Sequence, residues 1–181
     1  MKKQKKRAQI QNESGFTLIE LLLSIAIIAV IITAITYFSI DTFKAKAKSS
    51  VVLETQQNAR HAFQQMTYYI RNSEDGLNVG GSSFAPTDPG TLHLNMGAGA
   101  GDDVVFDVNS GRLRITTGGG TPEYLTTDAV TVTSLLFENN SASGTPGNIT
   151  MSMSLEYDNP SGAQEFNYSY DLQTSTSFRV E

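Results

Sequence analysis

The distribution of apolar residues divides this chain into one long N-terminal run and a series of short alternating runs. Residues 16–40 are mostly Leu, Ile, Val and Ala, and Glu20 is the one charged residue among them. A helix of this length measures about 37 Å, which exceeds the roughly 30 Å hydrocarbon core of a bilayer. We therefore expect residues 16–40 to form a membrane-spanning helix.

The helical pattern continues beyond this run, but its character changes. No Gly or Pro occurs between residues 41 and 71, and apolar or weakly polar positions recur every three or four residues. This spacing is typical of a helix with one buried face. The predicted stripe consists of Phe43, Ala47, Val51 or Val52, Thr55, Ala59, Phe63, Met66 and Ile70. The polar run from Asn72 to Gly76 then predicts the end of the helix.

The remaining residues alternate between apolar and polar positions in short runs separated by Gly, Asn, Ser and Pro. This period of two predicts strands, and the short connections favour an antiparallel sheet. The expected strands are 91–96, 103–108, 111–117, 130–137 with a bulge near Leu135, 148–157 and 164–172. Asn109-Ser110-Gly111 is suited to a tight hairpin turn. The expected fold class is α+β, with a long N-terminal helix whose second half packs against a small antiparallel β-sheet head.

Charge is distributed unevenly along the chain. The formal net charge is −5, but residues 1–15 hold five Lys or Arg and one Glu, so they carry +4 and the rest carries −9. Basic residues before a membrane span favour a cytoplasmic N-terminus, which places everything after residue 40 outside the cytoplasm. The acidic body argues against nucleic-acid binding, which usually needs a basic face.

The junction between the basic segment and the apolar run carries the most specific motif. Its residues are Ser14-Gly15-Phe16-Thr17-Leu18-Ile19-Glu20. This run resembles the prepilin signature of the type IV pilin superfamily, which includes the pseudopilins of type II secretion. The resemblance implies cleavage by a prepilin peptidase between Gly15 and Phe16 and methylation of the new Phe16 amine. It also implies assembly with other pilin or pseudopilin subunits through an inner-membrane platform.

On this interpretation the chain has four parts. They are a cytoplasmic leader peptide (1–15), a transmembrane half of the helix (16–40), an amphipathic half (41–75) and a β-rich globular head (76–181). The helix ending around Arg60, Met66, Ile70 and Arg71 is similar to that of minor pseudopilins, and it favours a minor subunit.

Glu20 requires an explanation because a carboxylate within a spanning helix costs about 2.5–3.5 kcal/mol on insertion scales. The resemblance implies that Glu20 pairs with the N-terminal amine of a neighbouring subunit during assembly. Burial in a low dielectric favours such pairing, because an unpaired ion is costlier there than a paired one. The alternative is that Glu20 lies shallow enough to reach the lipid headgroups.

Other candidate chemistry is sparse. The chain has no cysteine, so neither a disulfide nor a thiolate site is possible. His61 and His93 lie in separate predicted elements without a paired nucleophile, so we expect no catalytic residues and no cofactor. Asp102, Asp103 and Asp107 are oxygen ligands of the kind that calcium prefers, but their spacing matches no EF-hand loop. Alternation directs Asp103 and Asp107 to one face, which we expect to be a solvated edge.

These observations predict a structural pilin-like subunit rather than an enzyme. We expect it in the bacterial inner membrane first, and then in a type IV pilus or a type II secretion pseudopilus. The alternative is a single-pass membrane-anchored binding module that does not polymerise. The motif does not distinguish adhesion, motility, DNA uptake and secretion.

Overall fold

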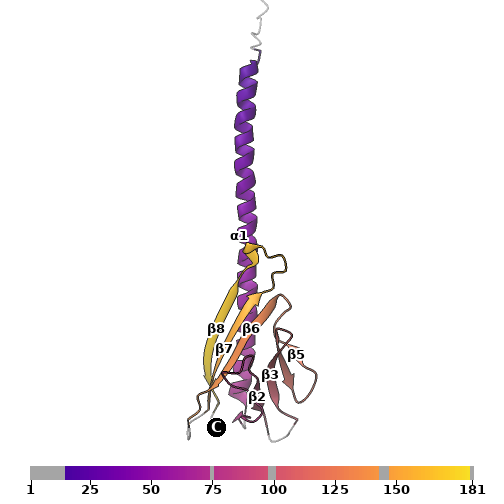
Figure 1. Cartoon of the computed structure of the whole chain (residues 1–181), viewed down its shortest axis with the longest axis vertical. Helices are drawn as coiled ribbons and strands as arrows, with labels where there is room; N and C mark the ends of the chain where they lie inside the picture. The colour runs from indigo at the N-terminus through magenta and orange to yellow at the C-terminus, as the bar shows by residue number, and fades with distance from the viewer. Residues whose placement is uncertain (1–14, 74–75, 98–100, 143–146, 180–181) are drawn as a thin grey trace, which may run out of the picture. The chain divides into compact units, whose positions relative to one another are not determined.

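A single long helix begins the described part of the chain in this computed structural model. The structure describes residues 15–73, 76–97, 101–142 and 147–179. Helix α1 runs from Leu18 to Asn72 (Figure 1). It starts two residues after the expected Phe16 and ends where the polar run begins; Glu74 and Asp75 of that run lie outside the described residues. The chain forms two compact units, Met1–Phe43 and Lys44–Glu181, and α1 contributes to both.

In the described residues eight strands follow α1, and all of their pairings are antiparallel. They are β1 (Gly76–Leu77), β2 (Leu92–Asn95), β3 (Val104–Asn109), β4 (Arg112–Thr117), β5 (Glu123–Tyr124), β6 (Val130–Asn139), β7 (Asn148–Tyr157) and β8 (Ser169–Ser177). The α+β class with a long N-terminal helix is thereby confirmed. The expectation of one sheet is wrong, because the strands form a five-stranded sheet in the order β1-β2-β3-β4-β5 and a three-stranded sheet in the order β6-β7-β8.

The hairpin between β3 and β4 forms at the turn that the sequence predicts. Ser110 and Gly111 adopt positive φ angles of 51° and 73°, and the flanking Asn109 and Arg112 face each other in the ladder. Two positive φ angles match the right-handed twist of adjacent strands. A Cβ at Gly111 would also approach the Thr131 side chain to 2.9 Å, so the position suits glycine for two reasons.

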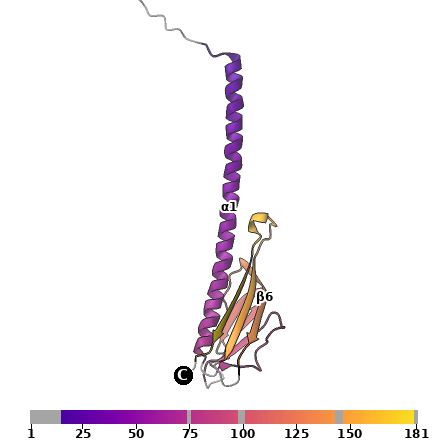
Figure 2. The same cartoon turned by 90° about the vertical axis from the view of Figure 1, so that its left-hand side faces the viewer.

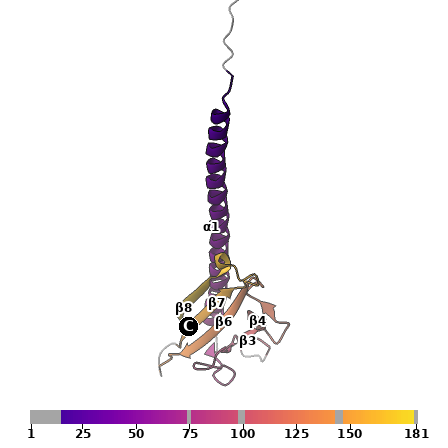
Figure 3. The ribbon, with the colours of Figure 1, turned by 45° about the horizontal axis from the view of Figure 1, so that its top comes forward.

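The two sheets meet along β6. The Val132 N–H donates to the Gly111 carbonyl at 2.7 Å, which joins the first strand of the second sheet to the β3–β4 hairpin. Figure 3 shows β3 and β4 beside β6 on the side away from β8. The expected bulge exists but lies between Val132 and Ser134 rather than near Leu135.

The core of the second unit lies between the sheets and one face of α1. Figure 2 shows the strands along one side of this part of the helix. The buried helical residues are Val51, Thr55, Asn58, Ala59, Ala62, Phe63, Met66 and Ile70. The predicted stripe is therefore confirmed from Val51 to Ile70. It is wrong at Phe43, which is 72% exposed and lies in the first unit, and at Ala47, which is only partly buried.

The last predicted strand is displaced along the chain. Residues 164–166 form a short 3-10 helix, η1 (Gln164–Phe166), and β8 begins only at Ser169. Tyr157 still donates its N–H to the Tyr168 carbonyl at 3.0 Å, so pairing with β7 starts just before β8. The long turn between β7 and β8 therefore takes up the residues that we assigned to the start of the strand.

Candidate functional site: the N-terminal junction and the apolar helix

The Gly15–Phe16 bond lies just before the first turn of α1. Residues 15–17 have no regular secondary structure, and all of residues 15–20 are exposed. A Cβ placed on Gly15 would meet no atom within 4 Å. The peptide bond that the motif marks for cleavage is thus unobstructed by the described part of the chain.

Thr17 begins α1. Its carbonyl accepts the first helical hydrogen bond, from the Leu21 N–H at 3.2 Å, and its Oγ1 accepts from the Glu20 N–H at 3.3 Å. This is N-cap geometry, in which the side chain satisfies a backbone donor that has no helical partner. The spacing Thr-x-x-Glu is that of a capping box. The motif residues therefore set the helix start as well as the cleavage bond.

Glu20 lies in the first turn of α1 and is exposed. A negative side chain there interacts favourably with the positive end of the helix dipole. The Glu20 backbone is used by the Thr17 cap, whereas no hydrogen bond or ion pair joins its carboxylate to the described residues. The carboxylate is therefore available to a group outside the chain.

The apolar half of α1 presents its large side chains outward. Within the described residues, α1 is the one helix long and apolar enough to span a membrane, and no residue of its most apolar 18-residue window is buried within the chain. Phe16 and the Leu, Ile, Val, Tyr and Phe residues from Leu18 to Phe43 are all among the exposed or half-exposed side chains. So much apolar surface requires an apolar environment, and a bilayer provides one.

Hydroxyl groups within this segment are satisfied by the helix itself. Ser24, Thr33, Thr36, Ser39 and Thr42 each donate to the carbonyl four residues earlier, at 2.8 Å. These bonds lower the cost of placing hydroxyl groups in hydrocarbon, where water is not available as a partner.

The calcium candidates contact different partners. Asp107 faces Arg114 on the next strand and accepts two hydrogen bonds from its guanidinium, at 2.6 and 2.8 Å. This contact raises the pKa of Arg114 above its ordinary value. The Asp103 carboxylate accepts a hydrogen bond from His93 Nε2 at 2.9 Å, and Asp102 is exposed. Across the described residues no group of three or more His, Asp or Glu side chains is placed to hold a metal ion.

Asp103 and Asp107 therefore differ from the sequence expectation. Both are half-buried rather than on a freely solvated edge. His93 lies in β2 and Asp103 directly precedes β3, so their contact depends on the pairing of these strands and is not visible in the sequence. His61 is exposed, and its Nδ1 lies 3.2 Å from the Leu125 carbonyl. Neither histidine lies beside a paired nucleophile in the described residues.

Comparison with known proteins identifies a family motif at the junction around Gly15 and Phe16. Residues 10–36 match the family model for the prokaryotic N-terminal methylation motif, which is the leader signature of type IV pilins and pseudopilins. Residues 10–14 of the match lie outside the described residues. No curated protein and no solved structure matches the chain.

The chain therefore carries a type IV pilin-like precursor motif on a long helix that leads into antiparallel sheets. The resemblance inferred from the junction residues is confirmed by this match. Together with the unburied apolar helix, the motif supports anchoring of the protein in a membrane.

Proposed function

We propose that this protein is a structural subunit of a type IV pilus or of a type II secretion pseudopilus. A prepilin peptidase cleaves it between Gly15 and Phe16, and the new Phe16 amine is methylated. Residues 1–15 act as a cytoplasmic leader, 16–40 cross the membrane, 41–75 support the head, and 76–181 form the extracytoplasmic surface. The protein is a substrate of the peptidase rather than an enzyme.

The observation that carries this proposal is the position of the methylation motif. The Gly15–Phe16 bond within it lies before the apolar helix rather than after it, so cleavage there leaves the helix on the mature protein. A secretory signal peptide is instead cut after its apolar region, which is then lost. A retained apolar helix that the described residues leave uncovered is suited to packing first in lipid and then among other subunits.

Glu20 is the proposed assembly residue. Cleavage leaves the Phe16 amine four residues before Glu20, so every mature subunit carries a cation and an anion at the same end of the helix. In a packed bundle the Glu20 carboxylate of one subunit pairs with the Phe16 amine of its neighbour, because burial makes either charge costly alone. The inner-membrane platform holds the subunits while these pairs form.

We assign the protein to a minor rather than a major component. The chain has no cysteine for the C-terminal disulfide loop that many pilins have, and the helix ending from Arg60 to Arg71 is similar to that of minor pseudopilins. These features support a subunit that works beside a different, more abundant one.

Mass spectrometry of the N-terminus tests the proposal. The chain is expressed with and without a prepilin peptidase, and the mature protein should begin at N-methylated Phe16 only when the peptidase is present. The alternative is a single-pass membrane-anchored binding module, which the self-contained core of residues 44–181 would also allow. An unprocessed Met1 start in the presence of the peptidase supports that alternative.

A further inference from the structure

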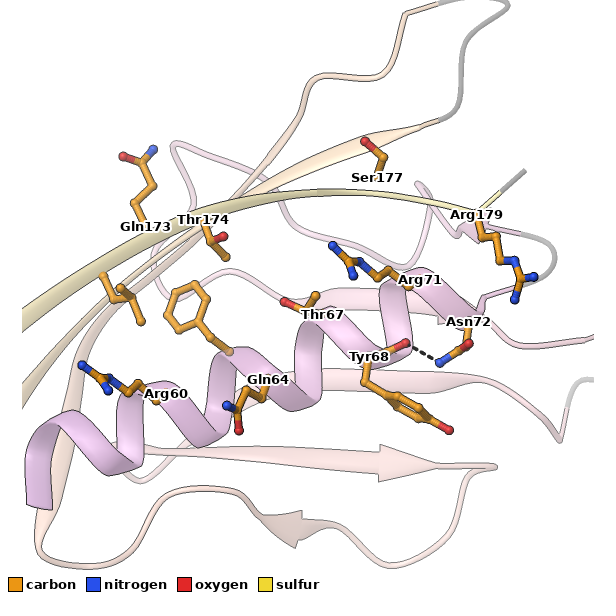
Figure 4. A pocket seen from close by; sticks show the side chains of 12 residues that line it. Arg60, Gln64, Thr67, Tyr68, Arg71, Asn72, Gln173, Thr174, Ser177 and Arg179 are labelled. Carbon is orange, nitrogen blue, oxygen red and sulfur yellow. Dashed lines mark hydrogen bonds between the residues drawn. The ribbon is translucent and has the colours of Figure 1, made fainter. Parts of the chain in front are cut away.

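A groove runs along the C-terminal part of α1, within the second compact unit. It has a volume of about 850 Å³ and is bounded by α1 on one side and by β8 on the other. Figure 4 shows Arg71 on the side of α1 that faces β8, with Thr174 on the strand opposite, whereas Gln64 and Tyr68 lie on the far side of the helix. Phe63 and Leu172 add apolar surface to the groove.

The groove gathers three of the five arginines of this unit. The chain has five basic residues after Lys48, all of them arginines, and Arg60, Arg71 and Arg179 line the groove. The other two are engaged elsewhere: Arg114 pairs with Asp107, and Arg112 donates to the Thr126 carbonyl at 2.8 and 3.1 Å.

None of the three groove arginines has a carboxylate partner among the described residues. No Asp or Glu lines the groove either. Arg71 is held at its wall by a 3.4 Å hydrogen bond from Nε to the Thr176 hydroxyl. Three arginines without a carboxylate partner in the described part of a chain of net charge −5 favour an anionic occupant.

The strand that bounds the groove also has a free edge. β8 is the last strand of its sheet, and β7 is its one partner among the described strands. Tyr157 donates to the Tyr168 carbonyl, and Phe178 donates to the Gly147 carbonyl, so the even-numbered residues of β8 bond to β7. Hydrogen-bonding groups alternate along an antiparallel strand, so odd-numbered residues such as Gln173 direct theirs to the other side.

The opposite edge of this sheet, formed by β6, has backbone groups that are already hydrogen-bonded. β6 is covered, because the Leu135 and Phe137 carbonyls accept from Gly90 and Ala85 at 2.7 and 2.8 Å. No such cover appears on β8 in the described residues. A row of unpaired backbone groups is a template for pairing with another chain.

We propose that the groove binds an extended, acidic segment of another protein, which adds to the free edge of β8 and places its carboxylates against Arg60 and Arg71. Backbone hydrogen bonds to the strand edge supply affinity, and the arginines supply selectivity for acidic side chains. An extended chain paired with β8 lies over the groove because β8 forms one of its walls. This inference goes beyond filament assembly and does not depend on leader processing.

The spacing of the arginines defines the ligand. Arg60 and Arg71 are 11 positions apart on α1, which corresponds to about 16 Å along the helix. An extended chain advances about 3.4 Å per residue, and its side chains alternate between faces. Two carboxylates on one face and four residues apart span about 14 Å, and flexible arginine side chains cover the difference. The ligand is therefore an extended segment with acidic residues at positions i and i+4.

The test uses the full-length chain in detergent micelles and a fluorescent seven-residue peptide of alternating Val and Thr, with Glu at its first and fifth positions. Fluorescence anisotropy gives the Kd. Arg60→Gln and Arg71→Gln should each weaken binding about tenfold, as expected for loss of one charge-assisted hydrogen bond. Lys48→Gln is the matched control, since Lys48 is exposed on α1 outside the groove, and its Kd should change less than about twofold.

The strand-pairing component is tested separately. Gln173→Pro removes an outward-facing N–H and should abolish peptide binding without breaking a bond to β7. If this variant loses its folded structure, the peptide carries the test instead: N-methylation of one alternate set of its residues should abolish binding, and methylation of the other set should be tolerated.

Several outcomes would overturn the proposal. If a peptide with Gln in place of Glu binds equally well, the arginines do not recognise its carboxylates. If both sets of N-methylated peptides bind equally well, the peptide does not pair with the edge of β8. Competition by a single-stranded oligonucleotide as strong as that by the peptide shows a general polyanion surface instead. A failure of leader cleavage leaves all of these measurements unchanged, so the two proposals fail independently.

Discussion

Thr17 caps α1 through the backbone of Glu20, not through its side chain. The Thr17 Oγ1 accepts from the Glu20 N–H at 3.3 Å, while the Glu20 carboxylate has no bond to the described residues. The start of the helix and the charge at its start are therefore separable by mutation. This separation allows the assembly role of Glu20 to be tested without disturbing the helix end.

Glu20→Ala and Glu20→Gln should both enter the membrane and lose the leader, because neither removes the backbone donor of the cap. Both should assemble poorly, since an unpaired Phe16 amine buried among packed helices costs several kcal/mol. Glu20→Gln keeps the size and hydrogen-bonding capacity, so it isolates the effect of charge. The measurement is the fraction of processed protein in sheared filaments or crosslinked pseudopili.

Thr17→Ala is the matched control for these variants. It removes the cap, at a cost of about 1 kcal/mol of helix stability, but leaves the carboxylate in place. Thr17→Ala should therefore assemble better than either Glu20 variant. Parental assembly of both Glu20 variants would show instead that Glu20 faces the lipid headgroups.

Gly15→Val should keep its leader when the peptidase is present. A Cβ at Gly15 contacts nothing within 4 Å, so the substitution leaves the chain's own structure intact. Any block then arises in the peptidase, which must approach the backbone closely at this position and is obstructed by a branched side chain. Mass spectrometry distinguishes the two products, and a mature mass of normal size would contradict the assignment of the cleavage bond.

Phe63→Ala should destabilise the second unit by about 3–5 kcal/mol, because it leaves a cavity in a core that is small for its surface. Phe63 is 5% exposed and lies in the cluster shared by α1 and both sheets. Chemical denaturation of a fragment comprising residues 44–181 measures the change. Leu53→Ala is the control on the same helix: Leu53 is 57% exposed, so its substitution should cost less than about 0.5 kcal/mol.

Asp107 and Arg114 should show a small favourable coupling free energy in a double-mutant cycle. They face each other across β3 and β4 and share two hydrogen bonds, but each side chain is 27% exposed, so solvent screens the pair. Asp107→Asn, Arg114→Gln and the double variant complete the cycle. The coupling should fall as salt rises, and a coupling independent of salt would indicate that packing rather than charge joins the two residues.

Several local features could be predicted from the sequence because short-range patterns encode them. The membrane-capable helix follows from the uninterrupted apolar run, and the junction follows from seven adjacent residues. The stripe from Val51 to Ile70 follows from its helical period, and the Ser110–Gly111 turn follows from the need for positive φ. Each depends on neighbours within a few positions, so no knowledge of the fold is required.

Other features depend on contacts between segments far apart in the sequence. Asn58 is polar and was not expected in the stripe, yet it is buried because its Oδ1 accepts from the Thr127 N–H at 2.9 Å. The His93–Asp103 contact arises only when β2 and β3 pair, and the division into two sheets depends on which edges meet. Alternation along a strand specifies its two faces but not its neighbours.

The groove illustrates this limit most clearly. Arg60 and Arg71 are visible in the sequence as parts of a helix end, and Arg179 as part of the C-terminal region. Only the path of β8 places the three arginines around one groove beside a free strand edge. The local hydrophobic pattern thus determines that the protein is anchored. The arrangement of charge on the folded surface depends on long-range strand pairing, which cannot be predicted from a short stretch of residues.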